Sequence, residues 1–193
     1  MKTLSKISTL LILAITVSSC AAIKDAIKSK SDNEVKKPLV YLEKAPKYNV
    51  KKFLSGNLDG FAIVQDENGK IIDGFVTKVV GDWEENRGTI KYTFNFNGGK
   101  RDVRTWLITV EDAESYTAIG HDFISPAVGR QAGNASEVSY TLIYPHKDKR
   151  EKVEFEENLY LVDENSAIVI SSMKIGKSKI GKIILSLKKS DAK

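Results

Sequence analysis

Apolar and polar residues alternate with a period of two along most of the chain after Asn57. The segment TIKYTFNFN, residues 89–97, places four apolar side chains on one face and the polar ones on the other. The segments EVSYTLIY at 137–144 and KVEFEENLYLVD at 152–163 follow the same rule. A period of two is typical of a half-buried β-strand, in which successive side chains point to opposite faces. The pattern predicts about nine strands, near residues 57–65, 70–82, 89–97, 101–111, 115–122, 135–144, 152–162, 166–175 and 182–188.

These strands are predicted to form one antiparallel sheet. Turn sequences such as DENG and ENRG separate them, and no long helical pattern lies between them. Because an open meander leaves its edges unpaired, we expect an all-β, antiparallel up-and-down barrel of about 8–10 strands, with a two-sheet sandwich as the alternative. The segment DFISPAVGRQAGN, residues 122–134, lacks alternation and is predicted to be a long loop, either a functional lid or a plain connection.

The first twenty residues have the pattern of an export signal. Lys2 and Lys6 precede a nearly apolar run of eight residues, 10–17, which is too short for a bilayer span of about 20 residues. The run ends in Val-Ser-Ser-Cys, which resembles the lipobox of bacterial lipoproteins, so Cys20 is predicted to become the lipidated N-terminus. Ala21, rather than Asp, follows the cysteine. By analogy with other lipoproteins, this favours the inner leaflet of the outer membrane, with the protein facing the periplasm.

Composition divides the chain into three parts. Residues 1–19 are the predicted signal peptide, and residues 20–49, rich in Lys, Ser and Asp, are the predicted lipidated N-terminus and flexible tether. Residues 50–193 are the predicted barrel domain, which opens with VKKFLSG, a short helix. The net charge of +5 includes the two lysines of the signal peptide, so the exported part is only weakly basic. This balance does not suggest a nucleic-acid partner.

The sequence contains no recognisable catalytic motif. No Gly-x-Ser-x-Gly elbow and no Gly-rich phosphate loop is present. His121 and His146 lie 25 residues apart without flanking metal ligands, and the single cysteine is assigned to lipidation. His121 precedes Asp122, but adjacent residues of a strand point to opposite faces, which argues against an acid–base pair. We therefore expect a protein that is not an enzyme and that needs no metal or cofactor.

Four segments occur in a characteristic order between about residue 50 and residue 188: FLSGNLDGFAIVQDENGKIIDGF, RTWLI, GRQAGNA and GKIILSLKK. Together they resemble an uncharacterised family of proteobacterial lipoproteins that is catalogued as a domain of unknown function. The motifs that carry the resemblance are Gly56-x-Leu58, the turn from Gln65 to Lys70, Arg104-x-Trp106 and Gly133-Asn134. The family's Asp-Asp-Trp-Met-Tyr-like stretch is EENLY here, at 156–160, without the tryptophan, so no role of that tryptophan is transferred.

The resemblance implies a lipobox and a role connected with lipid, because genes of the family often lie beside genes for membrane fatty-acid modification. No activity is established for the family. We compare its predicted barrel with the lipocalin and calycin barrels, which enclose one small ligand.

Two charged residues fall on apolar strand faces. Arg104 shares its face with Trp106, and Glu157 shares its face with Phe155. Inside a barrel they would have to be paired, because an isolated buried charge is costly. One interpretation is a structural ion pair, and the other is that Arg104 binds the headgroup or carboxylate of an acyl ligand. The candidate ligand-binding residues are Arg104, Trp106, Tyr92, Phe94, Tyr140, Phe155 and Glu157.

The sequence thus predicts a non-catalytic lipoprotein, held to the membrane through Cys20, that binds or carries an acyl lipid or another apolar small molecule. The alternative is a structural or envelope-assembly protein, with a barrel filled by its own side chains and a protein partner. A carrier should enclose an apolar void of roughly several hundred Å³ that is open at one end. A filled barrel should hold no void larger than a water molecule.

Overall fold

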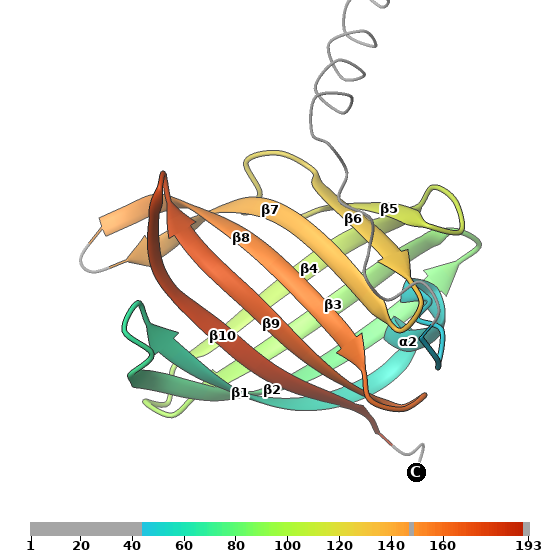
Figure 1. Ribbon diagram of the computed structural model, residues 1–193, viewed down its shortest axis with the longest axis horizontal. Coiled ribbons are helices and arrows are strands. Elements are labelled where there is room, and N and C mark those ends of the chain that lie inside the picture. The colour runs from blue at the N-terminus through green and yellow to red at the C-terminus, as the bar shows by residue number, and fades with distance from the viewer. Residues whose placement is uncertain (1–43, 147–148, 191–193) are drawn as a thin grey trace, which may run out of the picture. The chain divides into compact units, whose positions relative to one another are not determined.

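The computed structural model describes residues 44–146 and 149–190, which form a closed barrel of ten antiparallel strands (Figure 1). Each strand pairs with its neighbours in the sequence, and β1 pairs with β10 to close the ring. The predicted up-and-down barrel is confirmed, and the sandwich alternative is wrong. The strands are β1 (Gly56–Asp66), β2 (Ile71–Glu84), β3 (Arg87–Phe96), β4 (Arg101–Val110), β5 (Ser115–Ile119), β6 (Ala127–Ala132), β7 (Ala135–His146), β8 (Lys149–Leu161), β9 (Ser166–Ile175) and β10 (Ser178–Lys189).

The period-two pattern separates the inside of the barrel from the outside. Ile90, Leu142 and Val153 point inward and have no accessible surface. Their polar neighbours in sequence, such as Lys91 and Glu154, are exposed on the outer wall. Burial of the alternating apolar side chains is therefore the force that closes the sheet around one core.

The seam between β1 and β10 depends on a glycine. Leu58 lies opposite Lys189 at one end of the seam, and Asp66 lies opposite Gly181 at the other. Gly181 has a φ of +156°, and a Cβ added there would lie 2.2 Å from the carbonyl oxygen of Gln65. Because only glycine allows this approach, it lets β10 lie close to β1 at the seam. On its other side, the register of β10 against β9 shifts between Lys179 and Gly181.

The predicted loop at 122–134 contains a strand, so the assignment of this whole segment as irregular was wrong, and one of the ten strands was missed. β6 pairs with β5 and β7 and completes the wall. Its inward residues are Ala127, Gly129 and Gln131, which are buried but small or polar. At Gly129 a Cβ would lie 2.2 Å from the ring of Tyr116, so the aromatic ring fills the space that a side chain would need. The strand therefore lacks the apolar alternation that identified the others.

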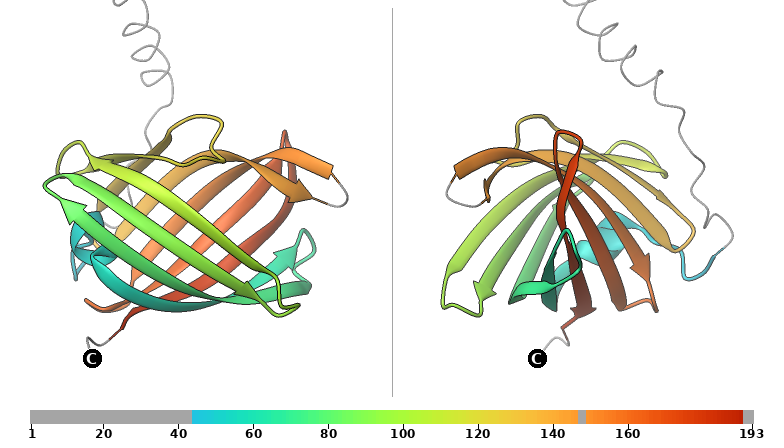
Figure 2. Two further views of the ribbon diagram at one scale, coloured as in Figure 1. Left: turned by 180° about the vertical axis from the view of Figure 1, so that it is seen from behind. Right: turned by 60° about the vertical axis from the view of Figure 1, so that its left-hand side comes forward.

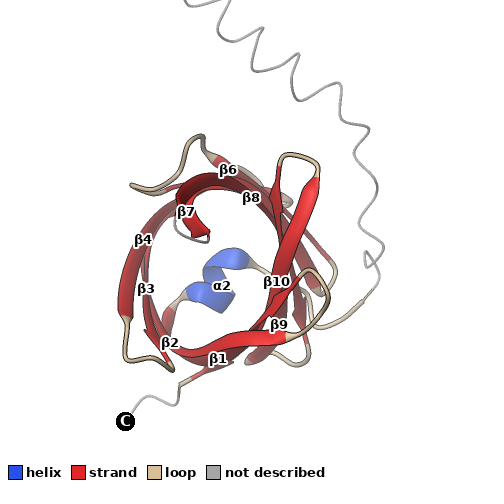
Figure 3. Ribbon diagram, turned by 90° about the vertical axis from the view of Figure 1, so that its left-hand side faces the viewer, coloured by secondary structure: helices blue, strands red, loops and turns tan. Residues whose placement is uncertain are grey.

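A short helix, α2 (Val50–Leu54), closes one end of the barrel and is visible inside the ring when the barrel is viewed from the opposite end (Figure 3). Val50, Phe53 and Leu54 are buried in the core, as is Tyr48 before the helix. The Asn49 side chain caps the helix by accepting a hydrogen bond from the Lys52 amide at 2.8 Å. Within the residues that the structure describes, no helix has the length and apolarity needed to cross a membrane.

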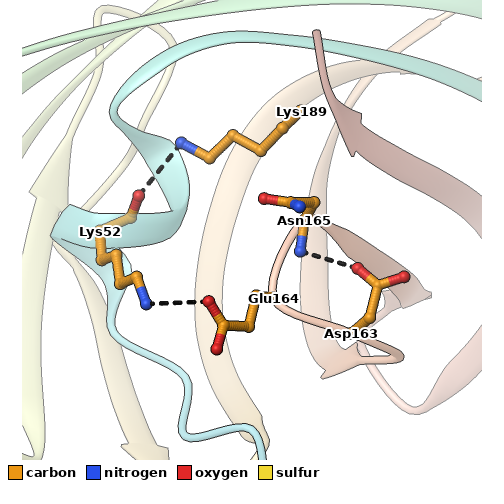
Figure 4. Close-up of polar contacts among 5 residues, drawn as sticks. All are labelled: Lys52, Asp163, Glu164, Asn165 and Lys189. Atoms are coloured by element: carbon orange, nitrogen blue, oxygen red, sulfur yellow. Dashed lines mark hydrogen bonds and ion pairs between the residues drawn. The ribbon is translucent and has the colours of Figure 1, made fainter. Parts of the chain in front are cut away.

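Polar contacts fix α2 to the last strand and to the β8–β9 turn (Figure 4). The Lys189 Nζ donates to the carbonyl oxygens of Lys52, at 3.1 Å, and Ser55. The Lys52 Nζ lies 3.4 Å from a carboxylate oxygen of Glu164. The two hydrogen bonds from Lys189 satisfy carbonyl groups at the end of the helix that have no partner within it.

The barrel therefore has two different ends. We call the end that holds α2 the closed end; it also carries the β2–β3, β4–β5, β6–β7 and β8–β9 turns. We call the other end the mouth; it carries the β1–β2, β3–β4, β5–β6, β7–β8 and β9–β10 connections (Figure 2).

Candidate ligand-binding site

The inward side chains leave a cavity of about 120 Å³ between α2 and the mouth. Val50 and Leu54 of α2 line it at the closed end, together with Tyr48. All seven residues proposed from the sequence line this cavity: Tyr92, Phe94, Arg104, Trp106, Tyr140, Phe155 and Glu157. Tyr92, Phe94 and Glu157 are only half-buried although they point inward, so their accessible surface faces the cavity or its mouth.

The cavity volume lies between the value expected for a filled barrel and the value expected for a lipid carrier. It is about ten times the volume that a single water molecule needs, so the barrel is not completely filled. It is also smaller than the void of several hundred Å³ expected for a carrier of a whole lipid. An engineered protein cavity of about 150 Å³ binds benzene, which indicates the size of group that fits here.

Aromatic rings form most of one wall. The ring of Trp106 lies 5.4 Å from that of Tyr92, 5.1 Å from that of Phe123 and 5.1 Å from that of Tyr140. Tyr140 stacks on Phe155 at 5.0 Å. The Trp106 Nε1–H is buried and has no hydrogen-bond partner among the described residues. It is therefore a hydrogen-bond donor without a partner in a mainly aromatic wall.

Glu157 is the acidic group deep in the cavity. Its Oε2 accepts hydrogen bonds from the Ser171 hydroxyl at 2.7 Å and from the Tyr140 hydroxyl at 3.2 Å. Burial raises the pKa of Glu157 above its usual value, and the two hydrogen bonds oppose this shift only in part. Burial also raises the pKa of Tyr140, and the nearby Glu157 charge adds to the effect. The hydroxyl therefore stays a hydrogen-bond donor to the carboxyl group.

Arg104 lies nearer the mouth and has acidic partners of its own. Its Nε is 3.3 Å from a carboxylate oxygen of Asp102 and 3.6 Å from one of Asp122. Its guanidinium group also lies over the rings of Phe94, at 5.9 Å, and Tyr144, at 5.5 Å. The expected Arg104–Glu157 pairing is thus wrong, because strand pairing places Arg104 opposite Tyr92 and Glu157 opposite Ser171.

The charges inside the barrel do not favour an anion. One guanidinium group faces two carboxylates at the mouth, and Glu157 adds a third carboxyl group further in. A ligand carboxylate would have to compete with Asp102 and Asp122 for Arg104. A ligand that donates a hydrogen bond, or that carries a positive charge, would instead meet the acceptor oxygens of Glu157.

No catalytic arrangement is evident in the described residues. No group of three or more His, Cys, Asp or Glu side chains in them is placed to hold a metal ion. His121 is exposed, whereas Asp122 points toward Arg104, so the two neighbours do not act together. Cys20, the predicted lipidation site, lies outside the described residues.

Several cavity residues were not proposed from the sequence. Tyr144 lies on an inward face that the alternation identified, but nothing in the sequence singled it out. Ser171 lies on the strand predicted at 166–175, for which no inward face was assigned. Asp122 follows β5 and reaches Arg104 through the connection to β6. Tyr48 and Val50 line the cavity because α2 folds into the barrel, which the sequence of a short helix does not reveal.

The fold and the cavity define a calycin-like β-barrel with one closed end. A family model described as "protein of unknown function (DUF3833)" matches residues 29–189, and the chain belongs to this family. No curated protein matches the sequence.

Two solved structures are similar to the barrel. One is a protein of unknown function from the DUF3598 family of Nostoc punctiforme, with a TM-score of 0.53 and 13% identity; the match covers 76% of this chain and 51% of that chain, so only about half of that protein is matched. The other is an S-type phycobiliprotein lyase from Guillardia theta, with a TM-score of 0.54 and 8% identity, covering 76% of this chain and 95% of that one. At these identities the likeness establishes the fold.

Proposed function

We propose that this protein binds an apolar small molecule inside its barrel, without catalysis, and presents it at the cell envelope. The observation that carries the proposal is the cavity, which has a largely aromatic and aliphatic wall and a single deep carboxyl group. Pockets for small ligands have this composition, with few polar groups that fix orientation. The similar barrel of a phycobiliprotein lyase supports a role in handling a small molecule.

The cavity volume limits what can enter it without rearrangement. A ring or a short acyl segment fits, and a longer acyl chain requires the half-buried rings near the mouth, such as Phe94 and Phe123, to move. The ligand group nearest Glu157 is expected to donate a hydrogen bond. An acyl lipid remains a candidate, with its chain inside the barrel and its headgroup at the mouth beside Arg104.

Membrane attachment through Cys20 is the second part of the proposal. An acylated cysteine would concentrate the barrel beside membrane lipid and so raise the effective concentration of an apolar ligand. Radiolabelled palmitate should be incorporated into the wild-type protein and not into the Cys20→Ser variant. Equal absence of label from both proteins would reject the lipoprotein assignment and the outer-membrane location that follows from it.

The binding proposal is tested by filling the cavity. Leu185 lines it, and Ile184, its neighbour on β10, does not. Leu185→Trp should reduce the amount of small molecule that organic extraction and mass spectrometry recover from the purified protein. Ile184→Trp is the matched control and should retain it. Failure to recover any molecule from the wild type, or equal recovery from both variants, would argue against a ligand in the barrel.

A structural or envelope-assembly role is the competing function, and the packing near α2 favours it. If the extraction finds nothing, the barrel is best regarded as a rigid body whose outer surface binds a protein. Crosslinking of wild-type protein in intact cells would then be expected to give one defined adduct.

A further inference from the structure

The mouth of the barrel carries an excess of exposed positive charge, whereas the closed end carries exposed groups of both signs. At the closed end the exposed acidic side chains Glu84, Glu85, Glu111, Asp112, Glu114, Asp163 and Glu164 lie among the exposed basic side chains Lys51, Lys52, Arg87 and Lys188. Exposed basic side chains gather at the mouth: Lys70, Lys100, Arg101, Lys149, Arg150, Lys177 and Lys179. Among the described residues, the exposed acidic side chains of the mouth are Glu67 and Asp73, which are too few to neutralise them. The chain is only weakly basic overall, so the positive charge of the mouth is a local excess.

Two basic residues of the closed end have polar partners, whereas the exposed ones of the mouth form no ion pair within the described part of the chain. At the closed end, the Lys51 Nζ donates to the carbonyl oxygen of Glu85, and Lys52 pairs with Glu164. Among the residues that the structure describes, none of the seven basic side chains at the mouth forms an ion pair. Their charge is therefore available to an external partner.

Exposed apolar side chains accompany these charges. Ile71 and Ile72 begin β2 at the mouth and are 58% and 59% exposed. Ile124, in the β5–β6 connection on the same end, is 44% exposed. Large aliphatic side chains beside unpaired lysines are typical of surfaces that enter the headgroup region of a membrane, where the aliphatic groups are buried and the cations contact anionic lipid.

We infer that the mouth of the barrel docks on an anionic phospholipid bilayer, with Ile71, Ile72 and Ile124 inserted among the headgroups. A bilayer fits better than an acidic protein, because large aliphatic side chains at the start of β2 and in the β5–β6 connection are exposed on an end rich in basic residues, a combination that suits the headgroup region. Docking in this orientation opens the cavity toward lipid and turns the closed end away from the membrane. The inference goes beyond the proposed function, since docking requires neither a bound ligand nor an acylated Cys20.

The test measures binding of the full chain with Cys20→Ser, which removes the acylation site, to lipid vesicles in a sedimentation assay. One vesicle is pure phosphatidylcholine and the other contains an equal share of phosphatidylglycerol. We expect the protein to favour the anionic vesicle and to lose that preference at high salt. The pure phosphatidylcholine vesicle measures any binding through the apolar run near the N-terminus, which all variants share.

A variant with reversed charges at the mouth is compared with a variant in which the same number of charges is reversed elsewhere on the barrel. The mouth variant is Lys100→Glu, Lys177→Glu, Lys179→Glu; its control is Lys78→Glu, Lys91→Glu, Lys188→Glu, at exposed positions on the outer wall and the closed end. Both change the net charge equally. The mouth variant should lose at least about tenfold in partition to anionic vesicles, and the control much less. Equal losses would mean that only net charge matters and would overturn the inference.

The apolar part is tested with Ile71→Ser, Ile72→Ser against Val80→Ser, Leu107→Ser, which lie on the outer wall. We expect the first pair to weaken binding to the anionic vesicles by a few-fold and the second pair to leave it unchanged. Wild-type binding that is the same for both vesicles, or absent, would exclude docking and leave an acidic protein as the partner of the mouth. The cavity proposal is judged separately, because ligand recovery by extraction should be the same in the mouth variant as in the wild type.

Discussion

The closed end and the mouth are built from the same ten strands, yet their interiors are packed differently. At the closed end, α2 fills the ring with Val50, Phe53 and Leu54, and its polar ends are satisfied by Lys189 and Asn49. At the mouth, inward rings remain half-buried and a cluster of three charges borders the cavity. The first end is packed like a protein core, and the second keeps accessible surface inside the barrel.

This difference indicates where stability and function reside. A packed end contributes apolar burial, which favours folding, and tolerates little change in volume. The interior also leaves polar groups without partners among the described residues, such as the Trp106 Nε1–H beside the cavity, which cost stability unless something else satisfies them. We therefore expect substitutions at the closed end to affect unfolding most, and substitutions toward the mouth to affect binding most.

The largest effect on stability is expected from removing the aromatic ring of Phe53 in α2. Phe53 is 2% exposed and packs against Tyr48 with 5.8 Å between the ring centres. Phe53→Ala should lower the free energy of unfolding by about 3–5 kcal/mol in urea denaturation. Phe96→Ala, at the mouth, should cost about half as much, because that ring is already partly exposed. Equal losses would contradict the contrast between the ends.

A smaller effect is expected where α2 touches the wall. A Cβ added at Gly81 on β2 would lie 1.6 Å from the carbonyl oxygen of Leu54, so the helix must shift. Gly81→Ala should lower the free energy of unfolding by about 1–3 kcal/mol. Gly98→Ala, in the β3–β4 turn at the mouth, meets no atom within 4 Å and should change it by less than about 0.5 kcal/mol. An unaffected Gly81→Ala protein would mean that α2 does not pack here in solution.

The sequence predicted the inward faces well and the polar contacts poorly. The alternation of Tyr92 and Phe94 with Thr93 follows from local burial, which is readable in a single strand. The partner of Arg104 depends on how far along the barrel each residue lies, and this is set by strand register and by the path between β5 and β6. β6 itself was missed because its inward positions, Ala127 and Gly129, make room for Tyr116 and carry no large apolar side chain.

Between the two ends, Glu157 links stability to pH. Burial raises its pKa above the ordinary value of 4.5, so the folded protein holds this proton more tightly than the unfolded chain. The stabilisation is complete below about pH 4.5 and is lost as the pH rises through the raised pKa. Each unit of difference corresponds to about 1.4 kcal/mol. Glu157→Gln accepts the same hydrogen bonds but cannot ionise, so its free energy of unfolding should fall less than that of the wild type over this range.

The matched control for this measurement is Glu154→Gln. Glu154 lies on the same strand but is exposed on the outer wall. Urea denaturation at several pH values should give curves for Glu154→Gln that are parallel to those of the wild type. If Glu157→Gln also ran parallel to the wild type, the carboxyl group would be in contact with bulk water and the cavity would be open far more widely than its volume indicates.

The smallest effect is expected from the ion pair that joins α2 to the β8–β9 turn. The side chains of Lys52 and Glu164 are 72% and 70% exposed, so water screens their attraction. A double-mutant cycle with Lys52→Ala and Glu164→Ala should give a coupling energy below about 0.5 kcal/mol. The same cycle for Arg104 and Asp122, whose side chains are 18% and 13% exposed, should give a larger coupling that depends less on salt. A coupling energy for Lys52 and Glu164 that exceeds the one for Arg104 and Asp122 would mean that charge, and not the packing of Phe53 and Leu54, holds α2 against the barrel.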